Sequence, residues 1–174
     1  MRLFVAIPLF AAAVLRGSLD TLRRVRGLRV VPEGSVHLTI KFLGQVREAV
    51  IPDLTLALGG IRGRRFSMSL EGVDAIPSLA RPRVVFIQVQ GPAELFELEE
   101  GVHDATPLIP RDKPFHPHVT IARGEGRVEL PEIKVARREV AVDSFCLMES
   151  VTRREGPEYR VVERFSLGDS SCPS

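Results

Sequence analysis

One short pattern occurs twice in this chain, and it limits the folds that the chain can adopt. The segment His-Leu-Thr-Ile begins at His37, and the segment His-Val-Thr-Ile begins at His118, 81 positions later. A predicted helix and a predicted strand precede each copy. The repeat therefore predicts a single two-lobed domain over residues 1–174, with approximate halves 1–80 and 81–168 and a polar tail, 169–174.

The spacing of apolar residues predicts several short strands and few helices. Strands are expected at residues 3–7, 36–43, 66–73, 83–89, 118–122, 140–147 and 159–167. Helices are expected at residues 11–25, with Gly27 as the stop, and at residues 52–58 and 92–103. Strands and helices do not alternate strictly, so the pattern favours an α+β fold with antiparallel sheet over a doubly wound parallel sheet.

Composition indicates a globular protein that does not cross a membrane. Hydrophobic residues make up 44% of the 174 residues, and no apolar run approaches the roughly 20 residues that span a bilayer. The apolar segment 3–15 has only Arg2 as a charged flank and is interrupted by Pro8, so we expect a first strand rather than a signal peptide. The two cysteines, Cys146 and Cys172, lie in unlike surroundings, so no disulfide is expected and the chain is predicted to be cytoplasmic.

The basic residues are unusual in kind rather than in number. The net charge is only +2, but 21 of the 24 basic residues are arginine. Arginine presents a planar fork that matches phosphate geometry, although a compositional bias of the host explains the same count. The clusters at 23–29 and 62–65 could form a rim for RNA or could simply be solvated. No obligate protein partner is evident, and a monomer is expected.

The repeated pattern places the same two side chains together in each half. Residues i and i+2 of a strand point to the same face, so His37 shares a face with Thr39, and His118 shares one with Thr120. The apolar residues between them point the other way. If a pseudo-twofold axis relates the halves, the two pairs can face each other across one cleft, with a phosphodiester between them.

Two histidines and two hydroxyl groups suffice for acid–base chemistry at phosphorus. The reference pKa of histidine is about 6.5, so one imidazole can accept a proton while the other donates one. Threonine hydroxyls can hold the charge of the non-bridging oxygens, and neither a metal ion nor another cofactor is required. A single His-x-Thr strand is more often an ordinary histidine. Two matched copies among only four histidines favour a catalytic pair.

Almost the whole chain resembles the two-histidine (2H) phosphoesterases, and specifically the RNA 2′,3′-cyclic phosphodiesterases, also called LigT-like 2′-5′ RNA ligases. The segments that carry the resemblance are 1–7, 36–44, 81–83, 114–123, 156–159 and 161–167. It implies two α+β lobes whose antiparallel sheets line a central, V-shaped cleft, with the helices outside.

The resemblance also implies an activity, a partner and a role for each residue. The reaction is hydrolysis of a 2′,3′-cyclic phosphate, on an RNA end or a nucleotide, to a 2′-phosphate. His37 would be the proton donor to the departing 3′-oxygen, and His118 the proton acceptor that activates water. Thr39 and Thr120 would hold the phosphate. The residues themselves do not distinguish the donor from the acceptor.

Phe42 and Arg123 each follow a motif histidine by five positions. The resemblance implies that the aromatic ring stacks on a nucleobase and that the guanidinium reaches the phosphate. Strand parity places both on the face opposite the histidines, so they can join the site only if the strands end or bulge first. Otherwise Phe42 would pack in the core, and Arg123 would form a surface salt bridge.

Three alternatives remain open at this point. The same histidines could join RNA ends through a 2′-5′ linkage, or the cleft could bind RNA without catalysis. His116 and His118 could instead contribute to the metal site of a metal-dependent hydrolase, although no nearby Cys or carboxylate completes a ligand set. His103 and the carboxylates of the third helix are expected to be solvent-exposed, and Tyr159 could line the cleft but is not counted as a site residue.

Overall fold

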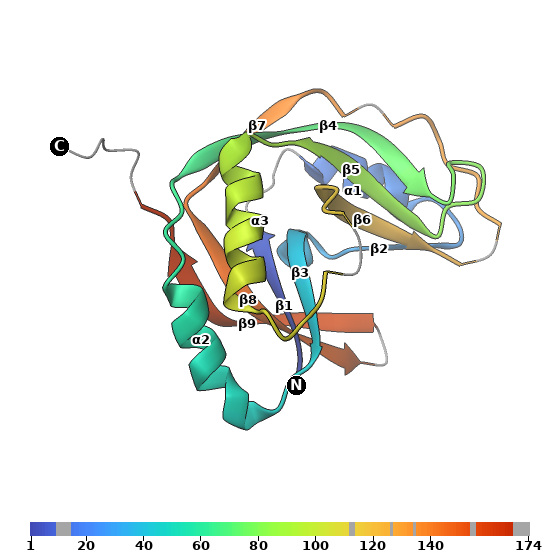
Figure 1. Ribbon diagram of the computed structural model, residues 1–174. Helices are drawn as coiled ribbons and strands as arrows, with labels where there is room; N and C mark the ends of the chain where they lie inside the picture. The colour runs from blue at the N-terminus through green and yellow to red at the C-terminus, as the bar shows by residue number, and fades with distance from the viewer. Residues whose placement is uncertain (10–14, 112–113, 126, 134, 154–155, 169–174) are drawn as a thin grey trace.

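The strands of the described chain all belong to one antiparallel sheet (Figure 1). The computed structural model describes residues 1–9, 15–111, 114–125, 127–133, 135–153 and 156–168. The strands are β1 (Arg2–Pro8), β2 (Leu28–Val30), β3 (His37–Gln45), β4 (Phe66–Ile76), β5 (Val84–Gln90), β6 (His118–Gly124), β7 (Arg138–Val142), β8 (Ser144–Arg153) and β9 (Gly156–Ser166). The α-helices are α1 (Arg16–Arg23), α2 (Ile51–Gly59) and α3 (Ala93–Ala105), and short 3₁₀ turns occupy Glu33–Ser35 and Glu48–Val50.

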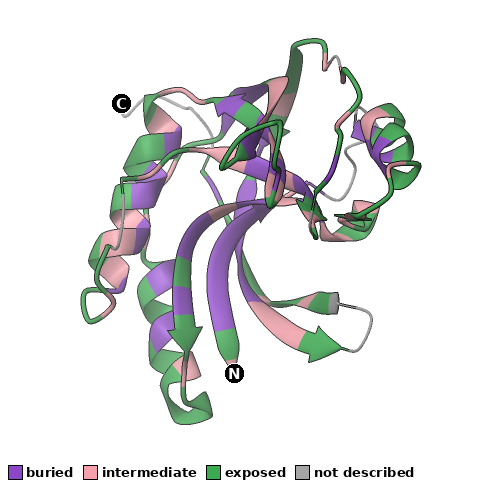
Figure 2. Ribbon diagram, turned by 90° about the vertical axis from the view of Figure 1, so that its right-hand side faces the viewer, coloured by how far each residue is buried: buried purple, intermediate pink, exposed green. Residues whose placement is uncertain are grey.

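The sheet has a centre with three further strands on either side. The strand order is β7-β4-β5-β6-β3-β1-β8-β9, and β2 pairs with β6 outside this path. All pairings between the named strands are antiparallel, which confirms the predicted α+β class. Figure 2 shows how strongly the sheet curls. The two halves of the sheet meet where β3 lies beside β6, and the sequence places a His-x-Thr motif on each of these two central strands.

Each half of the sheet takes strands from both parts of the chain. Strand β4 lies within residues 1–80 but pairs with β5 and β7. Strands β8 and β9 come from the end of the chain, and β8 pairs with β1 at its beginning. The two sequence halves therefore exchange strands and do not coincide with the two halves of the sheet.

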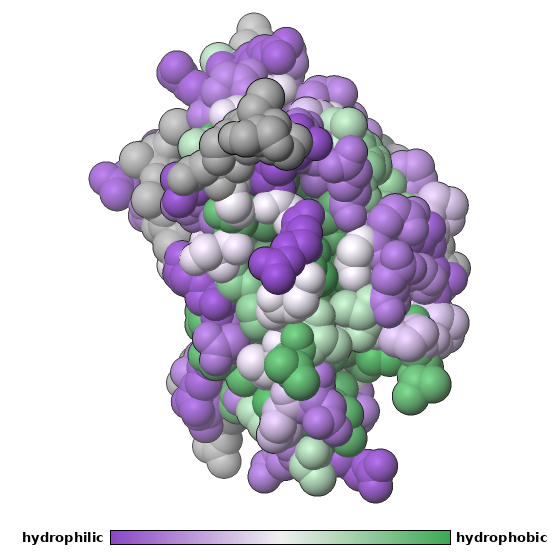
Figure 3. Space-filling view, turned by 60° about the vertical axis from the view of Figure 1, so that its left-hand side comes forward, coloured by the Kyte–Doolittle hydropathy of each residue, from purple (hydrophilic) through white to green (hydrophobic). Residues whose placement is uncertain are grey.

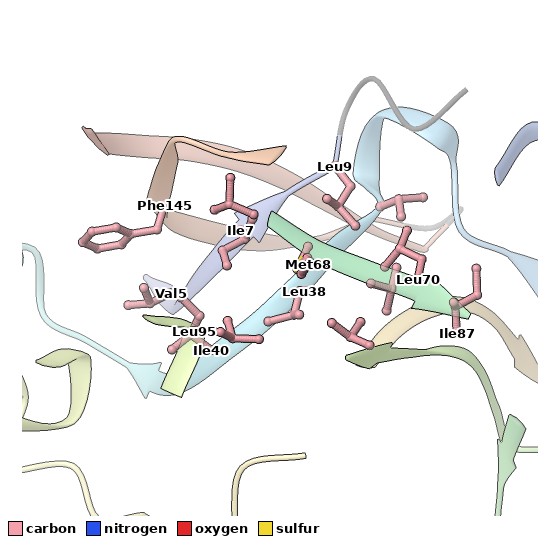
Figure 4. Packing of buried hydrophobic residues seen from close by; sticks show 14 of the residues in the cluster. Val5, Ile7, Leu9, Leu38, Ile40, Met68, Leu70, Ile87, Leu95 and Phe145 are labelled. Carbon is pink, nitrogen blue, oxygen red and sulfur yellow. The ribbon is translucent and has the colours of Figure 1, made fainter. Parts of the chain in front are cut away.

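The core lies on the face of the sheet opposite the two motifs' histidines. Figure 4 shows Leu38 and Ile40 of β3 packed with side chains from β1, β4, β5, α3 and β8. Leu38 and its β6 counterpart Val119 are both fully buried. Burial of a side chain of this size stabilises a fold by about 1.5–3 kcal/mol. The helices α2 and α3 lie together at one side of the molecule, and α1 lies apart from them (Figures 1 and 2).

Most of the predicted elements are confirmed, within a few residues at their ends. The predicted strand at 140–147 is wrong as a single element, because the chain leaves the sheet at Asp143 between β7 and β8. The short strand β2 was not predicted. The first helix is confirmed over α1, Gly27 has a positive φ of 82° just beyond it, and residues 10–14 and the tail 169–174 lie outside the described residues.

Neither the helices nor the surface of the described residues has the features of a membrane-spanning helix. No helix in the described ranges is both long and apolar enough to cross a bilayer. On the face in Figure 3, hydrophilic side chains surround a smaller area of mixed polarity.

Candidate active site

The two motif histidines stand at the first positions of β3 and β6 and are held in the same way. The Nδ1 atom of His37 lies 2.7 Å from the carbonyl oxygen of Ser35, and the Nδ1 atom of His118 lies 2.8 Å from that of His116. A carbonyl oxygen can only accept, so each Nδ1 carries the hydrogen and donates it. Each Nε2 is therefore left for proton exchange with a bound molecule.

The register between β3 and β6 brings the two His-x-Thr pairs onto one patch. Leu38 is paired with Val119 in this antiparallel ladder. The ladder consequently sets His37 opposite Thr120, and Thr39 opposite His118. In such a ladder the Cβ atoms of directly opposed residues lie about 4.5–5.5 Å apart, and diagonal neighbours lie about 7–8 Å apart. All four polar side chains are half-buried.

A β-bulge in each central strand changes which residues share the histidine face. In β3, Val5 pairs with Lys41 and Ala6 with Thr39, so Ile40 is an extra residue. In β6, Val85 pairs with Ala122 and Phe86 with Thr120, so Ile121 is the extra one. Two consecutive buried residues follow the threonine in both strands, and the alternation of faces then resumes with opposite parity.

The bulges place Phe42 and Arg123 on the same side as the histidines. Phe42 is 66% exposed, so the alternative that it packs in the core is wrong. Its ring centroid lies 6.1 Å from that of Phe4, which in turn lies 5.0 Å from the His37 ring. Arg123 is exposed and has no ion pair within the part of the chain that the structure describes, so the alternative of a surface salt bridge is not found there.

Aromatic rings surround His37 on two sides. The Tyr159 ring lies edge-on to His37 at 4.9 Å between centroids, and Phe4 and Tyr159 contact each other at 5.4 Å. His118 has a single described aromatic neighbour, Phe86, at 5.3 Å. Sequence reasoning did not count Tyr159 as a site residue. Its position follows from the β8–β9 pairing, for which the local sequence holds no signal.

The surroundings of His37 change its proton affinity. Burial lowers the pKa of His37, and the positive charges of Arg123 and His118 lower it further, whereas the hydrogen bond to Ser35 opposes the shift. The neutral imidazole is therefore favoured in the free protein.

His103 and two carboxylates of α3 contact Lys41 or Arg111 and not the motif side chains. His103 is half-buried with its Nδ1 atom 3.1 Å from Lys41 Nζ, so the prediction of full exposure is wrong for it. It is also wrong for Glu99, which is buried and pairs with Arg111 at 3.0 Å. Within the described residues, no group of three His, Cys, Asp or Glu side chains is arranged to hold a metal ion, and the His116 side chain is exposed.

Known proteins are similar to this chain in both sequence and fold. A family model described as LigT like Phosphoesterase matches residues 10–86. An RNA 2′,3′-cyclic phosphodiesterase of Aeropyrum pernix is 35% identical over 155 residues, which is 82% of this chain and 88% of that protein. The enzyme of the same name from Thermus thermophilus is 34% identical, over 96% of this chain and 90% of its own length.

Solved structures of known proteins also resemble the fold of this chain. The crystal structure of TT0787 from Thermus thermophilus superposes with a TM-score of 0.80 at 34% identity, covering 98% of this chain and all of that one. Escherichia coli LigT in complex with 3′-AMP has a TM-score of 0.77 at 27% identity and covers 95% of this chain and 97% of its own.

Proposed function

This chain belongs to the LigT-like phosphoesterases, the two-histidine (2H) family, and we propose that it opens RNA 2′,3′-cyclic phosphates to 2′-phosphates without a metal ion. It is a cyclic phosphodiesterase and therefore a hydrolase. The observation that carries the finer proposal is the pair of free Nε2 atoms on adjacent central strands, set diagonally across one patch with two threonines.

The proposed reaction needs one proton removed and one supplied. His118 Nε2 accepts a proton from water, and the oxygen of that water attacks phosphorus. The bond from phosphorus to the 3′-oxygen breaks, and His37 Nε2 gives its proton to the departing oxygen. Thr39 and Thr120 donate hydrogen bonds to the non-bridging oxygens, where charge must be stabilised in the transition state.

The lowered pKa of His37 suits a proton donor, provided that the substrate is bound. The cyclic phosphate carries a negative charge, which offsets the charge of Arg123 and so favours protonated His37 in the complex. Once the 3′-oxygen begins to depart, a weakly held proton is readily transferred. Arg123 then serves to bind phosphate, and the exposed Phe42 ring offers a surface on which a nucleobase can stack.

We also propose the broader assignments that accompany this activity. Residues 1–174 form a single two-lobed domain, with the cleft between the lobes at β3 and β6. The protein acts as a cytoplasmic monomer on RNA ends or on nucleotides with a 2′,3′-cyclic phosphate. Cys146, a buried free thiol, is compatible with a reducing compartment.

A single assay tests the activity, its regiochemistry and its metal requirement. A nucleoside 2′,3′-cyclic phosphate is incubated with the protein in EDTA, and the product is compared by chromatography with 2′- and 3′-phosphate standards. We expect the 2′-phosphate. A 3′-phosphate would exclude the proposed leaving group, and loss of turnover in EDTA would favour a metal-dependent enzyme. Tight RNA binding without turnover would favour a binding protein, and joining of RNA ends would favour the ligase.

Substitution of the histidines separates the pair from its neighbours. His37→Ala and His118→Ala should each lower kcat by at least about 100-fold, because proton transfer typically contributes about 10²–10⁴-fold. His116→Ala is the matched control. Its exposed side chain should be dispensable, since only its backbone carbonyl holds His118. Full activity in either motif variant would refute the two-histidine mechanism.

A further inference from the structure

A pocket adjoins the catalytic patch on the side of β2 and the β8–β9 hairpin. Its volume is about 310 Å³, and its lining includes Arg29 of β2, Arg123 of β6, and Arg153 and Glu158 of the hairpin. Ligand pockets in proteins start at about 300 Å³, so a group of roughly nucleotide size can enter it. The other lining side chains are mostly apolar, among them Val31.

The pocket shares residues with the patch around His37. Ser35 lines it, and the carbonyl of Ser35 accepts the Nδ1 hydrogen bond of His37. Tyr159 also lines it, with its ring edge-on to His37. A molecule bound at His37 can therefore continue directly into this pocket.

The charges in the pocket are arranged for an anion. Arg29 and Arg123 are directly opposite each other in the β2–β6 ladder, and like charges in that position destabilise a sheet. Arg29 contacts Glu125 at 3.0 Å, and Arg153 contacts Glu158 at 3.0 Å, but both pairs are about half exposed and contribute little. A bound phosphodiester between the arginines would relieve the repulsion.

Phe42 and this pocket lie in opposite directions from His37. Ser35 precedes β3, whereas Phe42 lies beyond the bulge toward the other end of that strand. If the terminal nucleobase occupies the Phe42 side, the pocket is available for the next part of the substrate.

We propose that this pocket binds the penultimate nucleotide of an RNA chain, on the 5′ side of the nucleotide that carries the cyclic phosphate. Arg29 and Arg153 hold the phosphodiester that links the last two nucleotides, and the apolar lining contacts the ribose or base. This inference rests on the proposed function and adds a preference to it. The enzyme is then expected to prefer an RNA end to a free mononucleotide as its substrate.

The test compares two substrates. A dinucleotide that ends in a 2′,3′-cyclic phosphate should have a kcat/KM about tenfold above that of the matching mononucleoside 2′,3′-cyclic phosphate. Arg29→Gln and Arg153→Gln should each lower that ratio by about 2- to 5-fold, since an exposed ionic contact contributes up to about fivefold in affinity. Arg137→Gln is the control, because Arg137 forms a comparable exposed pair with Glu139 away from the pocket and should leave the ratio unchanged.

A second dinucleotide tests the charge itself. Replacing the internucleotide phosphodiester with an uncharged methylphosphonate should bring the wild-type ratio of kcat/KM values close to one. With this substrate, the Arg29 and Arg153 variants should have the same ratio as the wild type. A wild-type ratio near one, or variants that slow both substrates equally, would overturn the pocket assignment while leaving the proposed function intact. Failure to hydrolyse the mononucleoside substrate at all would instead overturn the proposed function, and this inference with it.

Discussion

Arg123 influences His37 through its charge as well as through any contact with phosphate. The guanidinium is one of the groups that lower the pKa of His37. Removing a nearby cation stabilises the protonated imidazole, so the pKa of His37 should rise in Arg123→Gln. If His37 is the proton donor, the rate is lost as pH increases through this pKa, and the alkaline limb of the pH profile should move to higher pH.

The same variant should also bind the phosphate less well. A charge-assisted hydrogen bond contributes about 1.5–3 kcal/mol, so kcat/KM should fall by about 10- to 100-fold. Both effects are measured in one pH series of kcat/KM, with Arg47→Gln, an exposed arginine beyond β3, as the control. An alkaline limb that stays in place or moves to lower pH would contradict the assignment of His37 as the donor.

The residues of the site differ in how far their sequence neighbours reveal them. His37 and Thr39 are predictable because side-chain alternation in a strand is local. Phe42 and Arg123 require knowledge of a bulge, and Tyr159 requires the pairing of two distant strands. The sequence therefore predicts the proposed acid–base residues better than the residues around them.

At the scale of the elements, the two bulges are the feature that sequence parity missed. A bulge of this kind has two consecutive core-facing residues. In β6 these are Ile121 and Ala122, an apolar pair that could have been noticed. In β3 they are Ile40 and Lys41, and the charge of Lys41 conceals the signal, because lysine is rarely buried.

Lys41 is tolerated in the core because the end of α3 surrounds its ammonium group with acceptors. Its Nζ atom donates to Thr106 Oγ1 at 2.8 Å, to the Ile109 carbonyl at 2.7 Å and to the Thr106 carbonyl at 3.2 Å. Burial lowers the pKa of Lys41. The contacts fasten the bulge of β3 to the helix and to the chain that follows it.

We predict that Lys41→Met destabilises the fold despite removing a buried charge. The Ile109 carbonyl loses its described donor, whereas the Thr106 carbonyl keeps the Ile109 N–H at 3.1 Å. An unsatisfied buried acceptor costs about 1–3 kcal/mol, so the free energy of unfolding should fall by about that amount. Urea denaturation measures the change, and Arg47→Met, an exposed residue, should change it by less than about 0.5 kcal/mol. A Lys41→Met protein as stable as the wild type would show that the contacts only offset the cost of burying the charge.

At the scale of the whole molecule, strand positions were predictable but strand partners were not. The strand predicted at 140–147 fails because β7 pairs with β4, whereas β8 pairs with β1, so the chain must change partners at Asp143. Local periodicity reports whether a segment is a strand, and it contains no information about which distant strand lies beside it. The three residues of β2 are too few to show a period at all.

The strand pairing on which the proposed function depends is the one between β3 and β6. It brings together two motifs 81 positions apart, and its only described pair joins Leu38 to Val119. Both side chains are fully buried, on the face of the sheet opposite the two His-x-Thr pairs. We call this β3–β6 contact, formed by Leu38 and Val119, the seam. Packing at the seam should therefore set the distance between the two imidazoles as well as contribute to stability.

Two leucine substitutions distinguish these effects. Leu38→Ala at the seam and Leu58→Ala in α2 each truncate a fully buried leucine, and each should cost about 2–5 kcal/mol of stability. Only Leu38→Ala should shift the histidines, and a misplacement of about 1 Å can lower turnover by about 100-fold. Activity is measured at a temperature where circular dichroism shows both variants folded, with Val119→Ala as a smaller truncation from the other strand. Equal turnover in the Leu38 and Leu58 variants would mean that the two halves are positioned by the rest of the sheet, and that the seam serves stability alone.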